Sequence, residues 1–418
     1  GGELIVPEPL PNRSTPVLPT HPYKTQSISS FKTITSYSHR TGDPRGWSTE
    51  VLPTLRPTAP TGPTTSPSPY NGQPLLCSVS ETATVASMYP GDNLCDIIMY
   101  THVRVDQGTI APVDDADSYT TFTTVCSTVY STTSCGVSFD ARFADPSYFT
   151  TKVSEQLAQL RQKNVVHLGI LNMYDYPSRV KHYAPLTESA LEKMAALKGP
   201  TSRIIYGIGF FYYNDNSSWQ NLQVLVLAAT AAKDIIVVIT CVLSVPSATK
   251  CIALPPTALR SVSDIPPRFD RAVAMAEEKF DSPSQVLAFS FQMGTLIYNM
   301  TEEYRLPTDA LYKTCTGFIV SDSSQICERE ETLLTGEYAI GGMASMQYRK
   351  LFYTYDTVQT MKEKAGFVMN SRRRRANLTW FLFNVHLTDL SKKCHPTGPF
   401  ERLKEFRKFF LNISRRGF

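Results

Sequence analysis

The stretch IIYGIGFFYY, residues 204–213, decides the fold class. Ten successive residues carry no charge, and only glycine interrupts the aliphatic and aromatic side chains. Near-continuous apolar strands of this kind are typical of parallel sheets that are covered on both faces. The stretch therefore predicts a buried strand in a sheet with helices on its outside.

Similar apolar runs alternate with helical periodicity along the rest of the chain. Strand–helix alternation is typical of parallel pairing in an α/β protein. We predict a (β/α)8 TIM barrel over residues 75–414, with a doubly wound open sheet as the alternative. The predicted strands are residues 75–80, 95–103, 165–173, 204–213, 235–242, 286–293 and 378–387, and the predicted helices are residues 148–163, 186–197, 269–280 and 357–364.

Residues 1–74 have a different composition and hold 14 of the 29 prolines, together with many Ser and Thr. Such a segment buries too little apolar surface to offset its ordering entropy, so we expect it to be disordered. The composition suits a mucin-like, O-glycosylated stalk, and a plain linker is the alternative. The first residue is Gly1, so we expect that an upstream signal peptide has been removed.

Cysteine usage and sequons indicate the secretory pathway. Nine cysteines occur without a C-x-x-C pair, which argues against zinc, and persistent disulfides belong to oxidising compartments. The N-x-S/T sequons lie at Asn12, Asn216, Asn299, Asn377 and Asn412. We expect an extracellular glycoprotein with no cofactor and no metal.

Charge and hydropathy exclude two further classes. A net charge of +4 and a pI near 8.5 do not indicate a nucleic-acid binder. The longest apolar stretch, residues 222–245, holds Lys233 and Asp234 at its centre. A charge pair is costly in a bilayer, so we predict a buried helix and strand there and no transmembrane span.

Several motifs together resemble the family-18 glycoside hydrolases, the chitinases, across residues 75–410. Residues 75–77 (LLC) and 95–100 (CDIIMY) are similar to the first two strands of that family. Residues 355–358 (YDTV) resemble its Y-D-D-x-x-S, and residues 381–390 (FLFNVHLTDL) resemble its eighth strand. The resemblance implies a TIM barrel with a shortened α+β insertion at about residues 300–355.

The family's catalytic motif, D-G-x-D-x-D-W-E on the fourth strand, aligns with residues 206–213. Its three Asp positions fall on Tyr206, Gly209 and Phe211, and its proton-donor Glu falls on Tyr213. A Tyr, with an ordinary pKa of about 10, is a poor general acid for a glycosidic oxygen. No D-x-x-D-x-D-x-E occurs elsewhere in the chain. The resemblance therefore implies a pseudoenzyme without catalytic residues.

Three hypotheses follow for function. The first is a secreted, inactive chitinase-like protein that acts as an extracellular binding or structural component, with chitin, another glycan or an extracellular protein as partner. The second is a lectin-like module that binds chitooligosaccharide through Tyr213, Phe383 and Asn384. The third is an active hydrolase that uses unrecognised carboxylates. Aromatic side chains inside the barrel fit either a filled core, which we favour, or a retained glycan groove.

The resemblance also implies disulfides Cys77–Cys95 and Cys327–Cys394. Spacing alone suggests Cys126–Cys135 and Cys241–Cys251. This set leaves Cys315 over, either for an intermolecular disulfide or as a buried thiol.

Two further features can each be interpreted as structural or as functional. Three histidines in or near strands, His102, His167 and His386, are expected in the core rather than at a metal. Four arginines, Arg372 to Arg375, form either a solvated loop or a protease-processing or heparin-type site.

Overall fold

A computed structural model describes residues 72–175, 177–210, 233–243, 251–259, 269–279, 286–327, 331–336, 339–370, 377–394 and 397–416. The chain divides into two units, Gly1–Gly62 and Pro63–Phe418, and all described residues belong to the second. The Pro/Ser/Thr-rich segment up to residue 71 and the arginines Arg372 to Arg375 lie outside the described residues.

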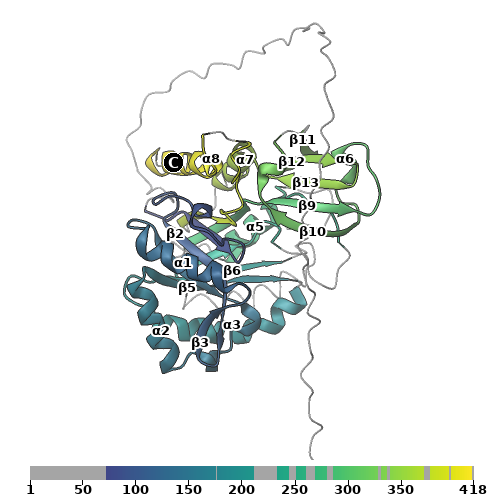
Figure 1. Cartoon of the computed structure of the whole chain (residues 1–418). Coiled ribbons are helices and arrows are strands. Elements are labelled where there is room, and N and C mark those ends of the chain that lie inside the picture. Colours follow the sequence, from purple (N-terminus) through teal and green to yellow (C-terminus); the bar gives the residue numbers. More distant parts are fainter. Residues whose placement is uncertain are drawn as a thin grey trace, which may run out of the picture. The chain divides into compact units, whose positions relative to one another are not determined.

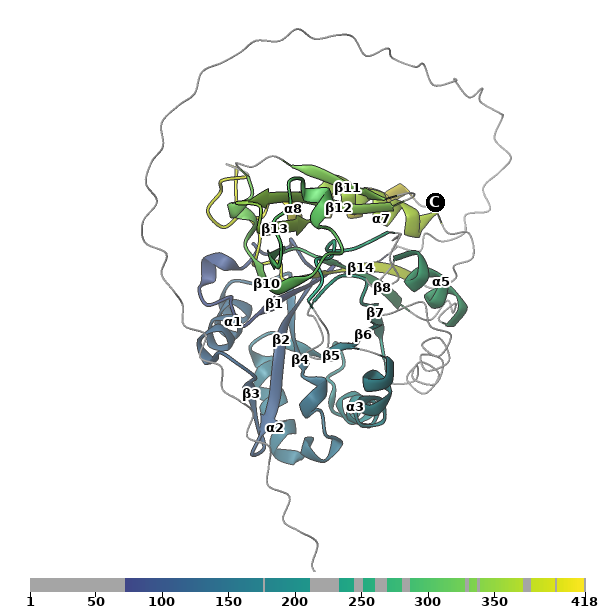
Figure 2. The same cartoon turned by 90° about the vertical axis from the view of Figure 1, so that its right-hand side faces the viewer.

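Eight parallel strands close into a barrel. Following one another around it, they are β1 (Leu76–Ser80), β2 (Ile97–Asp106), β4 (Ser134–Phe139), β5 (Val165–Asp175), β6 (Ile204–Phe210), β7 (Ile235–Val238), β8 (Val286–Gln292) and β14 (Asn377–Phe383). The barrel closes because β1 pairs in parallel with both β14 and β2 (Figure 2). A further strand, β3 (Thr109–Pro112), pairs antiparallel with β2. The predicted TIM barrel is confirmed.

The apolar runs form strands because both faces of the sheet are buried. Alternate side chains of each strand face the barrel interior or the surrounding helices. The helices are α1 (Ala116–Thr128), α2 (Thr151–Gln162), α3 (Pro177–Leu197), α5 (Phe269–Lys279), α7 (Val358–Met369) and α8 (Glu401–Arg416) (Figure 1). Short 3-10 turns lie at η1 (Ala86–Met88), η2 (Ala141–Phe143), η3 (Pro146–Tyr148) and η4 (Ser323–Gln325). Among the described residues, no helix is long and apolar enough to cross a membrane.

One strand of the barrel was not predicted. The strand β4 has the sequence SCGVSF, whose Ser and Gly residues hide its apolar pattern, yet all but its first residue are buried. Counting it moves residues 204–210 to the fifth position in the barrel and residues 165–175 to the fourth. The placement of Tyr206 and Gly209 on the fourth strand is therefore wrong.

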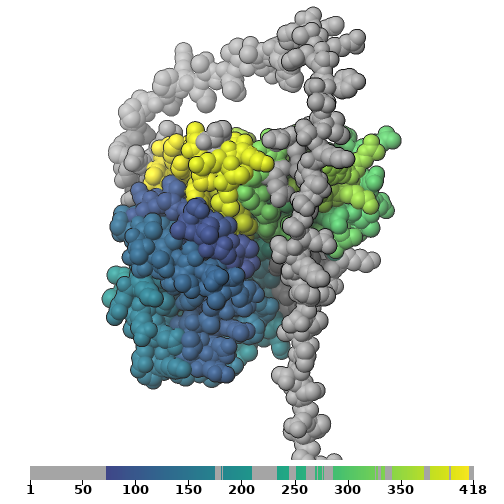
Figure 3. All heavy atoms as spheres, viewed as in Figure 1, coloured from purple at the N-terminus to yellow at the C-terminus, as the bar shows by residue number. Residues whose placement is uncertain are grey.

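An insertion follows the seventh barrel strand, β8. Its five-stranded antiparallel sheet has the order β10-β9-β13-β12-β11. The strands are β9 (Thr295–Met300), β10 (Cys315–Ser321), β11 (Thr332–Gly336), β12 (Ala339–Gln347) and β13 (Leu351–Tyr355), and the short helix α6 (Pro307–Ala310) joins β9 to β10. One sheet face packs in a single apolar cluster with the barrel interior. The insertion forms its own stretch of surface, drawn in green in Figure 3.

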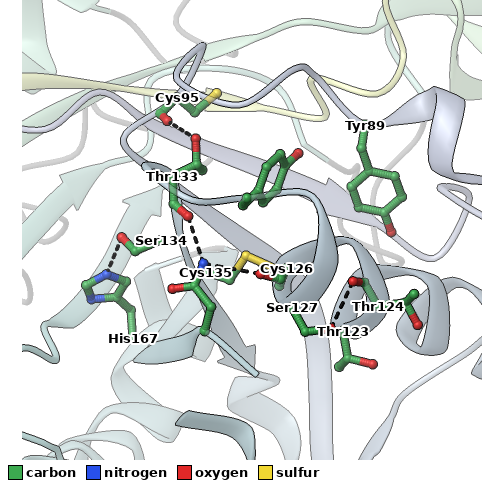
Figure 4. Close-up of a disulfide and its surroundings, with 12 residues drawn as sticks. Tyr89, Cys95, Thr123, Thr124, Cys126, Ser127, Thr133, Ser134, Cys135 and His167 are labelled. Carbon is green, nitrogen blue, oxygen red and sulfur yellow. Dashed lines mark hydrogen bonds between the residues drawn. A yellow bond between two sulfur atoms is a disulfide. The ribbon is translucent and has the colours of Figure 1, made fainter. Parts of the chain in front are cut away.

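Four disulfides are present in the described residues. Cys77–Cys95, Cys126–Cys135 and Cys327–Cys394 are the pairs that we expected. Figure 4 shows how Cys126–Cys135 ties the end of α1 to the start of β4. The first two pairs join neighbouring segments of the barrel, and Cys327–Cys394 joins the insertion to the segment after the eighth strand.

The expected pair Cys241–Cys251 is wrong, and so is the expectation that Cys315 is free or joins another molecule. Cys251 pairs with Cys315, whereas Cys241 is a buried free thiol. The pairing follows from backbone contacts, because Cys315 N donates to Cys251 O at 3.0 Å and Ile252 forms a bridge with Thr314. Cys241 instead continues the line of β7 and lies 3.2 Å from Ser290 Oγ.

Candidate functional site

In TIM barrels the functional residues lie at the carboxyl ends of the strands, so the site is sought at that mouth. The side chains of the fourth strand, β5, matter most, because the resemblance puts the catalytic carboxylates there. Leu171 faces the barrel interior, in a cluster with Met99 of β2 and Ile205 of β6. The flanking residues Ile170 and Met173 face the helices. The interior of the fourth strand is therefore apolar where catalysis would need acids.

The only carboxylate in the sequence of β5 is its last residue. Asp175 pairs through its backbone with Phe210 of β6, at the carboxyl end of the sheet. The preceding Tyr174 is buried and belongs to the interior cluster. Asp175 is thus the acidic residue that the sequence of this strand offers, and the predicted site omitted it because one strand was not counted.

The four positions that we aligned with the catalytic motif do not form one site. Tyr206 faces away from the interior, and its ring lies under the Lys233 ammonium at 4.2 Å. Gly209 has no room for a side chain, because a Cβ there would lie 2.8 Å from Ile239 O. The remaining two positions, Phe211 and Tyr213, lie outside the described residues.

The third strand is followed by an ion pair between the buried Asp140 and the largely exposed Arg142, which the sequence patterns did not predict. Asp140 is 1% exposed, and its carboxylate accepts from Arg142 Nε at 3.0 Å and Arg142 Nη2 at 2.5 Å. Burial alone would raise the pKa of Asp140, but the bonds from Arg142 outweigh it and lower that pKa below its ordinary value. A carboxylate held ionised in this way cannot act as a general acid.

Glu81, which follows the first strand, has the opposite electrostatic setting. Its pKa is raised, first by burial and also by the charges of Asp114 and Asp115. A raised carboxyl pKa favours proton donation, so Glu81 is better suited than Asp140 to act as an acid. It follows the first strand, however, whereas the resemblance puts the donor on the fourth.

Phe383 and Asn384 lie at the end of the eighth strand, β14, as expected. Phe383 is 3% exposed, and its ring packs against that of Phe381 in a tilted arrangement with centroids 4.4 Å apart. This residue is part of the filled interior and offers no open platform to a sugar. Asn384 is half-buried, and its Nδ2 donates to Gln292 Oε1 at 3.1 Å. Among the described residues, no hydrogen-bond partner is seen for the amide oxygen of Asn384.

The three barrel histidines are separate from one another. His167 bonds Ser134 Oγ at 2.8 Å at the amino end of the strands, as Figure 4 shows. At the carboxyl end, His102 Nδ1 lies 3.0 Å from Ser138 Oγ, and His386 Nε2 lies 2.7 Å from Thr82 Oγ1. Burial lowers the pKa of His102 and His167 to about 4 and that of His386 to about 3. Each therefore acts as a neutral hydrogen-bonding side chain.

Of the five predicted sequons, three are described. Asn299 on β9 and Asn412 on α8 are exposed, and Asn377 begins β14 and is half-buried. Asn12 and Asn216 lie outside the described residues.

Comparison with solved structures places this fold among chitinases and chitinase-like proteins. Human YKL-39, described as a pseudo-chitinase with retained chitooligosaccharide binding properties, matches with a TM-score of 0.56 and 13% identity, over 81% of this chain and 99% of that chain. The chitinase-like agglutinin of Robinia pseudoacacia matches with a TM-score of 0.56 and 13% identity, over 80% of this chain and all of that chain.

A structure described as a chitinase resembles this fold to a similar degree. The Group IV chitinase of Ostrinia furnacalis, solved with allosamidin, matches with a TM-score of 0.55 and 13% identity, over 81% of this chain and all of that chain. No family model and no curated protein matches the sequence. The fold is therefore shared with structures described as chitinases, a pseudo-chitinase and a chitinase-like agglutinin.

Proposed function

We propose that this chain is an extracellular chitinase-like protein that binds a glycan or an extracellular protein without hydrolysing it. The observation that carries the proposal is the apolar interior of the fourth strand, where Leu171 lies among Met99 and Ile205. Substrate-assisted hydrolysis needs one acid at the leaving oxygen and another carboxylate that orients the acetamide. Asp175 alone cannot supply both.

The extracellular location is supported by the four disulfides, since such bonds persist in oxidising compartments. The partner class is open between chitin, another glycan and an extracellular protein. Two similar structures, the pseudo-chitinase and the agglutinin, support binding as the retained activity of such a barrel.

A lectin-like role is the second candidate, and Asn384 favours it. Gln292 is fully buried, and its amide holds Asn384 in place at the mouth through the bond to Nδ2. An amide oxygen that is held in this way can accept a hydrogen bond from a sugar hydroxyl or an acetamide N–H. Phe383 contributes packing rather than a stacking surface, and a role for Tyr213 stays a prediction.

Binding to chitin beads and to soluble chitooligosaccharide tests these alternatives. A lectin-like site predicts binding that Asn384→Ala weakens about tenfold, the equivalent of one lost hydrogen bond, whereas Asn412→Ala on the exposed face of α8 has no effect. Absence of binding in the wild-type protein would remove the chitooligosaccharide-binding candidate and leave another glycan or an extracellular protein as the partner.

A hydrolase that uses Asp175 and Glu81 is the remaining alternative. The raised pKa of Glu81 is the observation in its favour. Turnover of a fluorogenic chitobioside that disappears in Glu81→Gln or Asp175→Asn would establish it and overturn the proposal.

A further inference from the structure

The edge of the insertion sheet carries an unusually apolar strand. β10 is the end strand of its sheet, and its sequence CTGFIVS has no charged residue and no proline. Cys251 and Ile252 pair with Cys315 and Thr314 at its start, and beyond them no described residue is paired with its outer edge. Ile319 in its middle is 59% exposed. Natural proteins usually protect such edges with charges or proline, because a flat apolar edge strand pairs with other chains.

The two faces of this strand differ. Phe318 stacks on Tyr298 with centroids 5.3 Å apart, on the face that packs toward the barrel. Ile319 lies on the opposite face, directly across from Ile297 of β9. The exposed side chain is therefore on the outer face of the sheet.

Asn299 lies on the same outer face. It is two residues beyond Ile297 on β9, so it is the diagonal neighbour of Ile319, about 7–8 Å away in an antiparallel pair. Asn299 is the one exposed residue of a strand that is otherwise buried. With Thr301, also exposed, it forms an N-x-T sequon.

The residue directly opposite Asn299 has no side chain, so the outer face of the sheet is open beside Asn299. That residue is Gly317 of β10, and a Cβ placed there would meet no atom within 4 Å. A β-bulge at Thr316 interrupts the ladder just beyond this point. A group attached to the Asn299 amide thus has room over Gly317 and can reach Ile319.

We propose that Asn299 carries an N-linked glycan whose first sugars cover Gly317 and Ile319 and so protect the β10 edge from pairing. In the transfer, the Asn299 amide nitrogen forms a bond to C1 of an oligosaccharide carried on a polyprenyl diphosphate. The C1–O bond to the phosphate breaks, the polyprenyl diphosphate leaves, and the amide proton is released. This modification rests on the extracellular location proposed above, but not on glycan binding by the barrel.

The test compares Asn299→Gln and Thr301→Ala with Asn412→Gln, which removes a second exposed sequon on α8. All are expressed in a eukaryotic secretory host, and glycan occupancy is read by mass spectrometry after enzymatic deglycosylation. We expect Asn299 to be occupied. In size-exclusion chromatography the ratio of oligomer to monomer should rise several-fold in both variants at this sequon. It should stay unchanged in Asn412→Gln.

A rescue variant separates shielding from a general effect of glycan loss on folding. Adding Ile319→Lys to Thr301→Ala places a charge on the bare edge and should restore the monomer. The proposal would be overturned if Asn299 carried no glycan in either the secreted protein or the protein retained in the cells. It would also be overturned by variants that stay as monomeric as Asn412→Gln, or by a Thr301→Ala defect that Ile319→Lys leaves unchanged. Hydrolysis and chitin binding are measured separately, so these results do not depend on whether the barrel binds or hydrolyses a glycan.

Discussion

Gly207 on the fifth barrel strand lies directly against Leu171 on the fourth. A Cβ added to Gly207 would lie 3.0 Å from Leu171 Cα and 3.2 Å from its Cδ2. Glycine at this position lets the interior close around an aliphatic side chain, in the region where a glycosidase of this fold needs space for acids and substrate.

We expect Gly207→Ala to lower the free energy of unfolding by about 1–3 kcal/mol, because overpacking forces the Leu171 backbone or side chain to move. Gly169→Ala should cost more, since its Cβ would lie 2.2 Å from Ile205 O. Urea denaturation measures both. Gly366→Ala is the matched control, because nothing lies within 4 Å of its Cβ position in α7 and Ala favours a helix. Equal stability of all three variants would contradict the close packing of β5 and β6.

The Cys251–Cys315 disulfide joins the segment after the sixth strand to the insertion sheet. Cys315→Ser should destabilise the protein by about 2–4 kcal/mol, since it releases a closed loop of 64 residues. Cys241→Ser should have a much smaller effect, and the wild-type Cys241 thiol should react slowly with a maleimide because it is fully buried. Peptide mapping without reductant that finds Cys241 bonded to Cys251 would refute this pairing.

A buried ion pair stands where the insertion returns to the barrel. Lys364 Nζ donates to Asp356, both side chains are fully buried, and Thr360 Oγ1 donates to the same carboxylate at 2.8 Å. Lys364→Met leaves Asp356 without its cation and should cost about 3–5 kcal/mol. Lys408→Met removes one partner of an exposed pair with Glu405 and should have little effect on the free energy of unfolding, because solvent screens that pair. Similar losses in the two variants would show that Lys364 is solvated.

Stability should fall in acid because the barrel histidines are held neutral, and His167 and His386 are the ones whose whole residues are buried. The folded pKa is about 4 for His167 and about 3 for His386, against an ordinary value of 6.5. The unfolded chain binds these protons first, so stability is complete above about pH 6.5 and is lost as the pH falls toward the folded values. Each histidine should cost about 2 kcal/mol at about pH 5.

Urea midpoints across the pH range check this dependence. His167→Gln and His386→Gln should each flatten the acid limb, whereas the exposed His182→Gln should leave its slope unchanged. An acid limb that is identical in all variants would assign the loss of stability to other groups.

Sequence patterns predicted the barrel because a parallel sheet buries both faces and leaves long apolar runs, as in residues 204–210. They missed β4 because Ser134, Gly136 and Ser138 serve close packing and hydrogen bonding rather than apolar burial. Ser138 Oγ, for example, accepts from Leu171 N at 2.9 Å. Because this strand was missed, residues 165–175 and 204–210 were each numbered one strand too low, and the predicted catalytic site was placed on the wrong strand.

The disulfides were likewise predictable only in part. Cys77–Cys95 and Cys327–Cys394 could be predicted because the family resemblance carries them. The partner of Cys251 could not, because its bond depends on contact with the residues around Thr314, 63 positions further along the chain. Contacts between distant segments are set by tertiary packing, which spacing in the sequence does not report.

Turnover of a fluorogenic chitobioside by the purified, disulfide-intact protein decides whether this barrel is an enzyme. Because Leu171 occupies the interior of the fourth strand, we expect no release of fluorophore above that of the heat-denatured protein, while an active chitinase of the same fold serves as the positive control. Turnover that persists through purification and disappears in Asp175→Asn or Glu81→Gln would make this barrel a hydrolase.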